Sequence, residues 1–335
     1  MTSSDVAIVG TGIPGLAAAL GLSQQQLGVA LIGPKPKPHA KARAESFDAR
    51  IYAIAPASVA LLERLGVWSS VDQARVCPVE RMRVFGDAGN ELTFDAYGAT
   101  VDRLATIVEE SELLRVLDAA CGFQPAIKRV SSPFVSLNAE ASAARLTLED
   151  SSAVTARLVI GADGATSPVR AAAGINATVK SYEQSAVVAN FACERPHLNT
   201  AWQWFTDEGV IALLPLPGDH VSLVWSAPTA LATELAELKA DALAARVTER
   251  TAKALGQLSS IDKAHTFALR RLMVSSTIAP RVALIGDAAH VVHPLAGQGL
   301  NLGLQDVTSL LDVIGERESF RDIGDEVLLR RYERG

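Results

Sequence analysis

A short apolar run near the C-terminus, Val282–Ile285, leads into a segment whose residue types could bind an anionic or polar ligand. Gly286-Asp287 follows it at once, and Asp is unfavourable within a strand but favourable at a turn. Gly297-Gln298-Gly299 then begins a run, Leu300–Val313, whose apolar residues recur at helical spacing. A helix that begins on glycines offers unpaired N–H groups and a partial positive charge to an anionic ligand. The alternative is a simple strand-to-helix loop in which the glycines only permit close packing.

A second glycine segment lies at the N-terminus. The apolar run Asp5–Val9 predicts a buried parallel strand, and GTGIPG at 10–15 predicts the turn into an Ala/Leu-rich helix that ends near Gln26. A further apolar run, Val29–Ile32, completes a strand–helix–strand unit. In this setting a GxGxxG spacing favours a dinucleotide site over a bare tight turn. The three glycines then serve the tight turn, the close approach of a pyrophosphate and helix–strand packing, in the order Gly10, Gly12 and Gly15.

The residue that commonly ends the second strand of such a unit is acidic and holds the adenosine ribose, but this chain has Gly33 there. Lys35 and Lys37 follow between prolines. The lysines could bind a 2′-phosphate, which would indicate an NADP-dependent dehydrogenase. Alternatively, backbone or another side chain holds the ribose and the lysines are solvated. We favour the second interpretation because an NADP site gives no account of residues 282–303.

A third segment repeats the pattern. The apolar run Ala153–Ile160 is followed by Gly161-Ala162-Asp163-Gly164 and a loop that contains Ser167 and Arg170. The Asp-Gly pair could be a plain turn. However, parallel strands bind ligands at their carboxyl ends. Strand ends at 9, 160 and 285 all carry glycines and two carry Asp, so we expect the segments near residues 12, 163 and 287 to converge on one elongated ligand.

Other patterns outline the elements around these segments. Helices are predicted at Pro56–Leu65 and Glu110–Ala120, and a hairpin at Arg81–Phe85 and Glu91–Phe94. Residues 182–226 are strand-rich and hold three of the four tryptophans, Trp202, Trp204 and Trp225, which could line an apolar pocket or form ordinary core. Residues 230–255 have a helical composition.

Composition excludes several classes of protein. The 335 residues include 49% apolar and 20% charged residues, as in a folded protein, and the net charge of −6 gives no reason to expect nucleic-acid binding. Three separated cysteines favour free thiols in a reducing compartment. No apolar run approaches the length of a membrane span, and the N-terminus leaves no room for a signal peptide. His290 and His293 do not form a metal-like cluster, so no metal is predicted.

The order GTGIPG (10–15), GADGATSPVR (161–170) and GDAAHVVHPLAGQGLNLGLQD (286–306) resembles the FAD-dependent aromatic hydroxylases with the para-hydroxybenzoate hydroxylase fold, and most of all the ubiquinone-biosynthesis hydroxylases. The resemblance extends to RIYAIAPASVALLERLGVW (50–68), IVEESELLRVL (107–117), WQWFTDEGVIALLPLP (202–217) and LRRYER (329–334). It implies an α/β fold with a Rossmann-like FAD-binding domain (1–72, 103–177 and 266–335) and an inserted, mainly β substrate domain (73–102 and 178–265).

The resemblance also implies a site. In that family FAD lies extended across the first domain, and the matching positions here are Gly10, Gly12, Ile13, Pro14, Gly15, Arg50, Arg115, Asp163, Gly164, Gly286, Asp287, Pro294, Gly297, Gln298, Gly299, Leu300 and Asn301. Asp287 is expected to hold the ribityl hydroxyls. Pro294, Gly297 and Gln298 are expected to form the catalytic loop against the flavin ring, with no side-chain base.

The implied reaction is hydroxylation of the aromatic ring of a polyprenylated phenol through a flavin C4a-hydroperoxide, with NAD(P)H and O₂. The expected location is cytoplasmic, with peripheral membrane contact or membership of a biosynthetic complex left open. Two alternatives remain at this point. One is an NADP-dependent dehydrogenase without flavin, and the other is a non-catalytic flavoprotein subunit of a biosynthetic complex.

Overall fold

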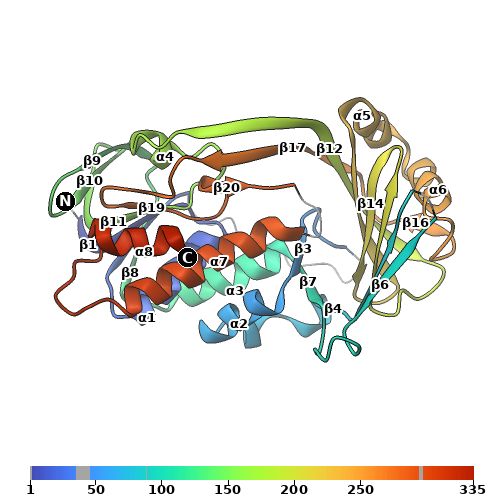
Figure 1. Cartoon of the computed structure of the whole chain (residues 1–335), viewed down its shortest axis with the longest axis horizontal. Helices are drawn as coiled ribbons and strands as arrows, with labels where there is room; N and C mark the ends of the chain where they lie inside the picture. The colour runs from blue at the N-terminus through green and yellow to red at the C-terminus, as the bar shows by residue number, and fades with distance from the viewer. Residues whose placement is uncertain (1, 35–45, 88, 294–296) are drawn as a thin grey trace.

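The computed structural model describes residues 2–34, 46–87, 89–293 and 297–335, which form two lobes joined by two long strands. In Figure 1 the first lobe contains both chain ends and most of the helices, and the second lobe is a sheet with α5 (Thr229–Glu237) and α6 (Ala240–Arg250) on its far side.

The first lobe is built on a mainly parallel sheet, as the apolar runs predicted. Its strands are ordered β18-β19-β11-β1-β2-β8, and β10 and β9 continue from β11 as an antiparallel extension. β1 is buried on both faces, because Val6, Ala7 and Ile8 are fully buried. The strand bounds are β1 Thr2–Val9, β2 Val29–Ile32, β8 Ile127–Val130, β9 Phe134–Ala139, β10 Ala144–Leu148, β11 Ala153–Gly161, β18 Ile278–Ala279 and β19 Val282–Leu284.

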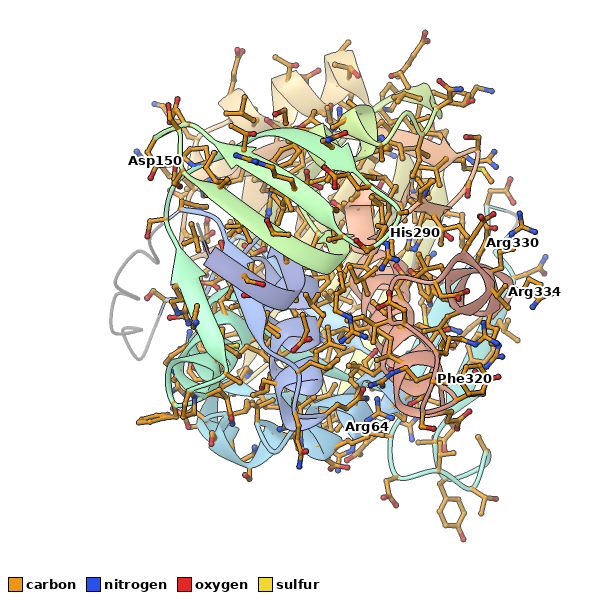
Figure 2. The ribbon with its side chains drawn as sticks, turned by 90° about the vertical axis from the view of Figure 1, so that its left-hand side faces the viewer. Arg64, Asp150, His290, Phe320, Arg330 and Arg334 are labelled. Carbon is orange, nitrogen blue, oxygen red and sulfur yellow. The ribbon has the colours of Figure 1, made fainter. Side chains whose placement is uncertain are left out.

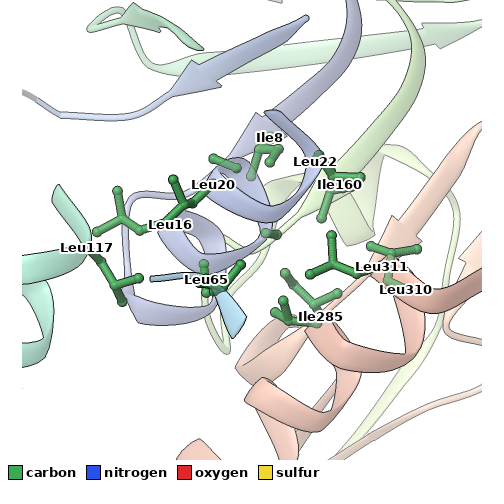
Figure 3. Packing of buried hydrophobic residues seen from close by; sticks show 14 of the residues in the cluster. Ile8, Leu16, Leu20, Leu22, Leu65, Leu117, Ile160, Ile285, Leu310 and Leu311 are labelled. Carbon is green, nitrogen blue, oxygen red and sulfur yellow. The ribbon is translucent and has the colours of Figure 1, made fainter. Parts of the chain in front are cut away.

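Helix α1 (Ile13–Gln24) is apolar on all sides and is buried between the sheet, α3 (Glu110–Gly122) and α7 (Gln298–Gly315). Figure 3 shows Leu117 of α3 on one side of α1 and Leu310 and Leu311 of α7 on the other. A Cβ at Gly21 would lie 2.4 Å from Leu311 Cδ1, so this glycine sets the close approach of α1 and α7.

Three shorter helices complete the first lobe: α2 (Pro56–Arg64), α4 (Pro168–Ala172) and α8 (Glu326–Arg334). The Tyr332 hydroxyl of α8 donates a 2.6 Å hydrogen bond to the Leu284 carbonyl and ties the last helix to β19. Figure 2 shows Arg330 and Arg334 pointing outward from α8. No helix in the described ranges is long and apolar enough to cross a bilayer.

The second sheet has the order β20-β17-β12-β15-β14-β13-β5-β6, with β16 also paired to β12. β12 is 17 residues long, ten residues longer at its start than the predicted Val187–Ala192, because it pairs with β17 across the gap between the lobes (Figure 1). The bounds are β5 Arg81–Phe85, β6 Glu91–Asp95, β12 Ala177–Cys193, β13 Thr200–Thr206, β14 Gly209–Leu216, β15 His220–Pro228, β16 Leu258–Ser260, β17 His265–Val274 and β20 His290–Val291.

A small antiparallel sheet, β3-β7-β4, lies between the lobes. Its strands are β3 Ile51–Ile54, β4 Cys77–Val79 and β7 Ala105–Glu109, and the one-turn 3₁₀ helices are Trp68–Ser70, Gln73–Arg75 and Gly286–Ala288. Trp225 and Trp204 are buried on the side of the second sheet that α5 and α6 cover, so they belong to the core and not to a pocket.

Candidate functional site

The three glycine segments meet at one edge of the parallel sheet, as predicted. Val9 is in register with Gly161, and Gly161 is in register with Leu284, so strands β1, β11 and β19 end side by side. Beyond these ends, Gly12, Gly164 and Asp287 line the same cavity of about 670 Å³. A cavity of this size encloses one drug-sized group.

The cavity lies between the two lobes and has two chemically different walls. The first-lobe wall presents glycines, helix starts and charged side chains. The opposite wall is the uncovered face of the second sheet and is mainly apolar, with Met82, Ala201, Gln203, Val210, Ala212, Leu214, Val224 and Ser226. A polar ligand and an apolar one can therefore meet in this cavity.

The glycines of the first motif divide into packing and ligand-facing positions. Gly10 has φ +121°, and a Cβ there would lie 2.1 Å from the Ala162 carbonyl oxygen. A Cβ at Gly15 would lie 2.2 Å from the Gly10 oxygen. Neither residue lines the cavity. A Cβ at Gly12 would meet no atom within 4 Å, and Gly12 does line the cavity together with Ile13 and Pro14.

Two helices begin at the cavity wall. α1 follows Gly12 and α7 follows Gly297, which is in the left-handed conformation at φ +66°, and neither helix start has a side-chain cap. Gln298, Gly299 and Leu300 of the first turn of α7 line the cavity. The helix dipoles favour negative charge at both points. Pro294, predicted in the same loop, lies outside the described residues.

Asp287 presents its carboxylate to the cavity. No described part of the chain gives it a hydrogen bond, and the surrounding protein atoms raise the pKa of its carboxyl. Asp306 holds the preceding turn: its Oδ2 accepts from the Gly286 N–H at 2.7 Å and lies 2.8 Å from His290 Nε2. The hydrogen bond to Asp306 raises the pKa of His290.

Besides Gly10 and Gly15, two predicted cofactor residues with charged side chains do not line the cavity. Asp163 is turned into its own loop, where Oδ2 accepts from the Val169 N–H at 2.9 Å and stabilises the start of α4. Arg115 lies on the exposed side of α3, paired with Glu112 and bonded to the Ser70 carbonyl. The leucine-rich helix was predicted correctly, but its residue pattern does not indicate on which side of it the cavity lies.

Asn301 lines the cavity, yet its amide is occupied by the protein. Its Oδ1 accepts from the Ala55 N–H and the Ser58 hydroxyl, both at 2.8 Å. Its Nδ2 donates to the carbonyls of Ala53, at 2.9 Å, and Gly297, at 3.2 Å. Asn301 therefore fixes the start of α7 against β3 and α2.

Sequence reasoning missed a charged group at the cavity wall. Glu110 Oε1 accepts from Tyr52 Oη at 2.9 Å and from Arg50 Nη1 at 3.3 Å. Burial, together with the Glu110 charge, raises the pKa of Tyr52 well above its usual value. Arg50 also lies over the Phe267 ring, and Arg270 lines the same cavity. The one available signal was that Glu110 begins a helix directly after a buried strand.

The structure also explains the missing acidic residue at position 33. A Cβ at Gly33 would lie 2.7 Å from Thr11 Cγ2, so the Thr11 side chain occupies the space that a side chain at position 33 would need. Lys35 and Lys37, the basis of the NADP interpretation, lie outside the described residues.

Comparison with known proteins was made on this basis. Residues 3–334 match the model of the FAD binding domain family. The chain is 36% identical over 334 residues to the 3-demethoxyubiquinol 3-hydroxylase of Escherichia coli K12, covering 98% of this chain and 84% of that protein. It is 33% identical to the ubiquinone hydroxylase UbiL of Rhodospirillum rubrum, covering 98% and 77%.

Among solved structures, the crystal structure of pqsL, a probable FAD-dependent monooxygenase from Pseudomonas aeruginosa, superposes with a TM-score of 0.82 at 22% identity, covering 99% of this chain and 92% of that one. At this identity the likeness shows the fold. Together with the family match and the sequence relatives, the fold and the site define an FAD-dependent monooxygenase.

Within that class, the chain belongs to the family of the ubiquinone-biosynthesis hydroxylases. The predicted family, α/β fold, FAD cofactor and enzyme class are confirmed, and NAD(P)H is the reductant typical of this family. The flavin-free dehydrogenase and the non-catalytic subunit are no longer needed as alternatives.

Proposed function

We propose that this protein hydroxylates the aromatic ring of a polyprenylated phenol in ubiquinone biosynthesis, with FAD, NAD(P)H and O₂. The single observation that carries this proposal is that one cavity joins the three glycine segments to an apolar sheet face. The relatives in Escherichia coli and Rhodospirillum rubrum, a 3-demethoxyubiquinol 3-hydroxylase and a ubiquinone hydroxylase, supply the substrate class.

The described residues fit FAD. Gly12 leaves the space a pyrophosphate needs, and α1 begins there with no side-chain cap. Asp287 offers a carboxylate to which no described residue donates a hydrogen bond, and it would accept hydrogen bonds from ribityl hydroxyls. Bound FAD supplies hydride acceptance from NAD(P)H and activation of O₂ for transfer of a hydroxyl group to the ring.

The remaining roles follow from the two walls. The start of α7, from Gly297, would favour negative charge on the flavin pyrimidine ring by on the order of 1 kcal/mol. The apolar wall would hold the phenol ring and exclude water from it. Arg50 would balance negative charge on the cofactor while Glu110 keeps its guanidinium at the wall. Pro294 remains a proposed member of the flavin loop from sequence.

We also propose the two-domain division at 1–72, 103–177 and 266–335 against 73–102 and 178–265. It is supported by separate hydrophobic clusters on the two large sheets, two on the first sheet and one on the second, and by the hairpin β5–β6 joining the second sheet. β12 begins at Ala177 and β17 begins at His265, each next to one of these boundaries. Cytoplasmic location, peripheral membrane contact and a biosynthetic complex are further proposals that rest on the family alone.

Product analysis tests this function. FAD-loaded protein is incubated with NADH or NADPH, O₂ and a 2-prenylphenol, and the products are identified by mass spectrometry. We expect substrate-dependent oxygen consumption and a product heavier by one oxygen atom, which carries ¹⁸O when ¹⁸O₂ is supplied. NAD(P)H oxidation that phenols do not stimulate, with no oxygenated product, would overturn the proposal.

A further inference from the structure

We infer that the cavity-side face of the β5–β6 hairpin binds the apolar tail of the substrate, as an extension of the ring site. This inference rests on the proposed function. The face consists of Met82 and Val84 on β5 with Phe94 and Leu92 on β6. We call it the tail face.

The tail face continues the cavity-lining face of the second sheet onto its last two strands. In a sheet, paired residues on neighbouring strands and alternate residues along one strand share a face. Val224 pairs with Ala212, and Ala212 pairs with Gln203, all of which line the cavity. Gln203 is in register with Val84 of the next strand.

The last two strands extend this face beyond the cavity. Met82, the outermost cavity residue on β5, pairs with Phe94. Val84 pairs with Leu92, one pleat further out. The pleat adds roughly 7 Å of apolar surface at about 3.4 Å per residue. A chain that leaves the ring site along this wall would therefore stay in apolar contact.

The tail face is exposed to solvent, whereas charged side chains on the other side of the same hairpin pair with each other. Phe94 is 47% and Leu92 55% exposed. On the opposite side, Arg83 forms an ion pair with Glu91 and lies over the Phe85 ring. A strand that places its apolar side chains toward solvent next to a ligand cavity indicates a ligand or partner surface.

The limited volume of the cavity indicates that the substrate tail is what occupies the tail face. About 670 Å³ accommodates one drug-sized group, and the proposed function places both a flavin ring and a phenol ring there. A polyprenyl tail would have to leave the cavity, and the apolar exit described above is the tail face. A bilayer is the competing occupant, and the experiment separates the two.

The test compares two ligands on the FAD-loaded protein, 2-farnesylphenol and 2-methylphenol, with dissociation constants from tryptophan fluorescence and KM from oxygen uptake in detergent micelles. The variant Leu92→Thr/Phe94→Thr keeps β-forming residues at exposed positions. Tyr97→Ser, which removes a 94% exposed aromatic ring from the adjacent loop, is the matched control. Melting temperatures verify that all forms are folded.

We expect the double variant to bind 2-farnesylphenol about tenfold more weakly, from the loss of contact with two half-buried apolar side chains. Binding of 2-methylphenol and kcat should not change, and Tyr97→Ser should match the wild type. Equal affinity of wild type and double variant for 2-farnesylphenol would overturn the inference. So would unchanged affinity in micelles with loss of binding to phospholipid vesicles, which would assign the face to a bilayer.

The binding measurements test this inference independently of the proposed function. If the wild type binds both phenols but hydroxylates neither, the proposed function fails, while the tail face is still judged by the dissociation constants. If it hydroxylates both and the double variant shows no selective loss, the function stands and the tail face is wrong.

Discussion

Replacing Asn301 by Ala should weaken both the fold and the cofactor site, although we do not place this residue against the flavin. The amide makes four hydrogen bonds, to Ala53, Ala55, Ser58 and Gly297. They join α7 to β3 and the start of α2, at the point where α7 begins at the cavity. The substitution leaves the Ala55 N–H and two carbonyls without these partners.

The magnitude follows from the bonds that are lost. Each of the four bonds contributes on the order of 0.5–1.5 kcal/mol, so the free energy of unfolding should fall by about 2–6 kcal/mol. With an unfolding entropy of about 2.1 cal/mol/K per residue, this corresponds to a fall in melting temperature of roughly 3–9 °C for a chain of this length. The affinity for FAD should also fall, because the Gly297 carbonyl is no longer held and the first turn of α7 loses its fixed position.

Differential scanning fluorimetry of the flavin-free protein and FAD titration measure the two effects. Ser58→Ala removes one of the four bonds and should cost about 1 kcal/mol. Asn138→Ala, at an exposed site in β9, should match the wild type. If Asn301→Ala melts within about 1 °C of the wild type and binds FAD equally well, the amide does not organise the site and this reasoning is refuted.

Four further predictions concern single positions. Gly12→Val should fold, because a Cβ at this position has no atom within 4 Å, but its side chain should occupy the space for the pyrophosphate and prevent FAD binding. A normal flavin-to-protein absorbance ratio would contradict this. Asp287→Asn should bind FAD at least about tenfold more weakly through loss of charge-assisted hydrogen bonds. The folded-state pKa of Asp287 is raised, so the flavin-free wild type should also lose stability relative to this variant as pH rises from 3.8 toward that higher pKa. If urea unfolding gives a free-energy difference between the two proteins that does not change with pH, this prediction is refuted. His290→Asn should remove a stabilisation that is fully present below pH 6.5 and fades as pH rises through the higher folded-state pKa, so a constant stability difference between pH 5 and 9 would count against the His290–Asp306 pair. Gly33→Asp should lower the melting temperature because the new side chain would collide with the Thr11 side chain, and Thr11→Ala in the same chain should restore it. An unchanged melting temperature for Gly33→Asp alone would show that Thr11 moves aside without cost.

Much of the fold was accessible from the sequence because its signals are local. Continuous apolar runs at 5–9, 29–32 and 153–160 predicted buried parallel strands, and glycines at fixed positions after them predicted turns at the sheet edge. The predicted hairpin at 81–94 and the helix that begins at Glu110 were also correct. The convergence of the segments near 12, 163 and 287 followed from the rule that parallel strands end at one edge.

The direction of individual side chains was not accessible in this way. Asp163 and Asp287 both follow a strand and a glycine, but the first caps α4 and the second faces the cavity. Arg50 and Arg115 are both arginines near predicted helices, and only Arg50 reaches the cavity wall. In each pair the difference depends on which partners lie within hydrogen-bonding reach, and those partners are distant in the sequence.

The sequence by itself determined the main strands and helices, their order, and the convergence of three glycine segments where three strands end, because strand and turn formation depend on neighbouring residues. Tertiary structure decided the rest. It selected which of two carboxylates stays free, filled the place of the acidic residue at 33 with Thr11, and set the exposed pair Leu92 and Phe94 on the same sheet face as the cavity. These outcomes depend on the register and packing of strands that are far apart along the chain, and only the folded structure fixes that register and packing.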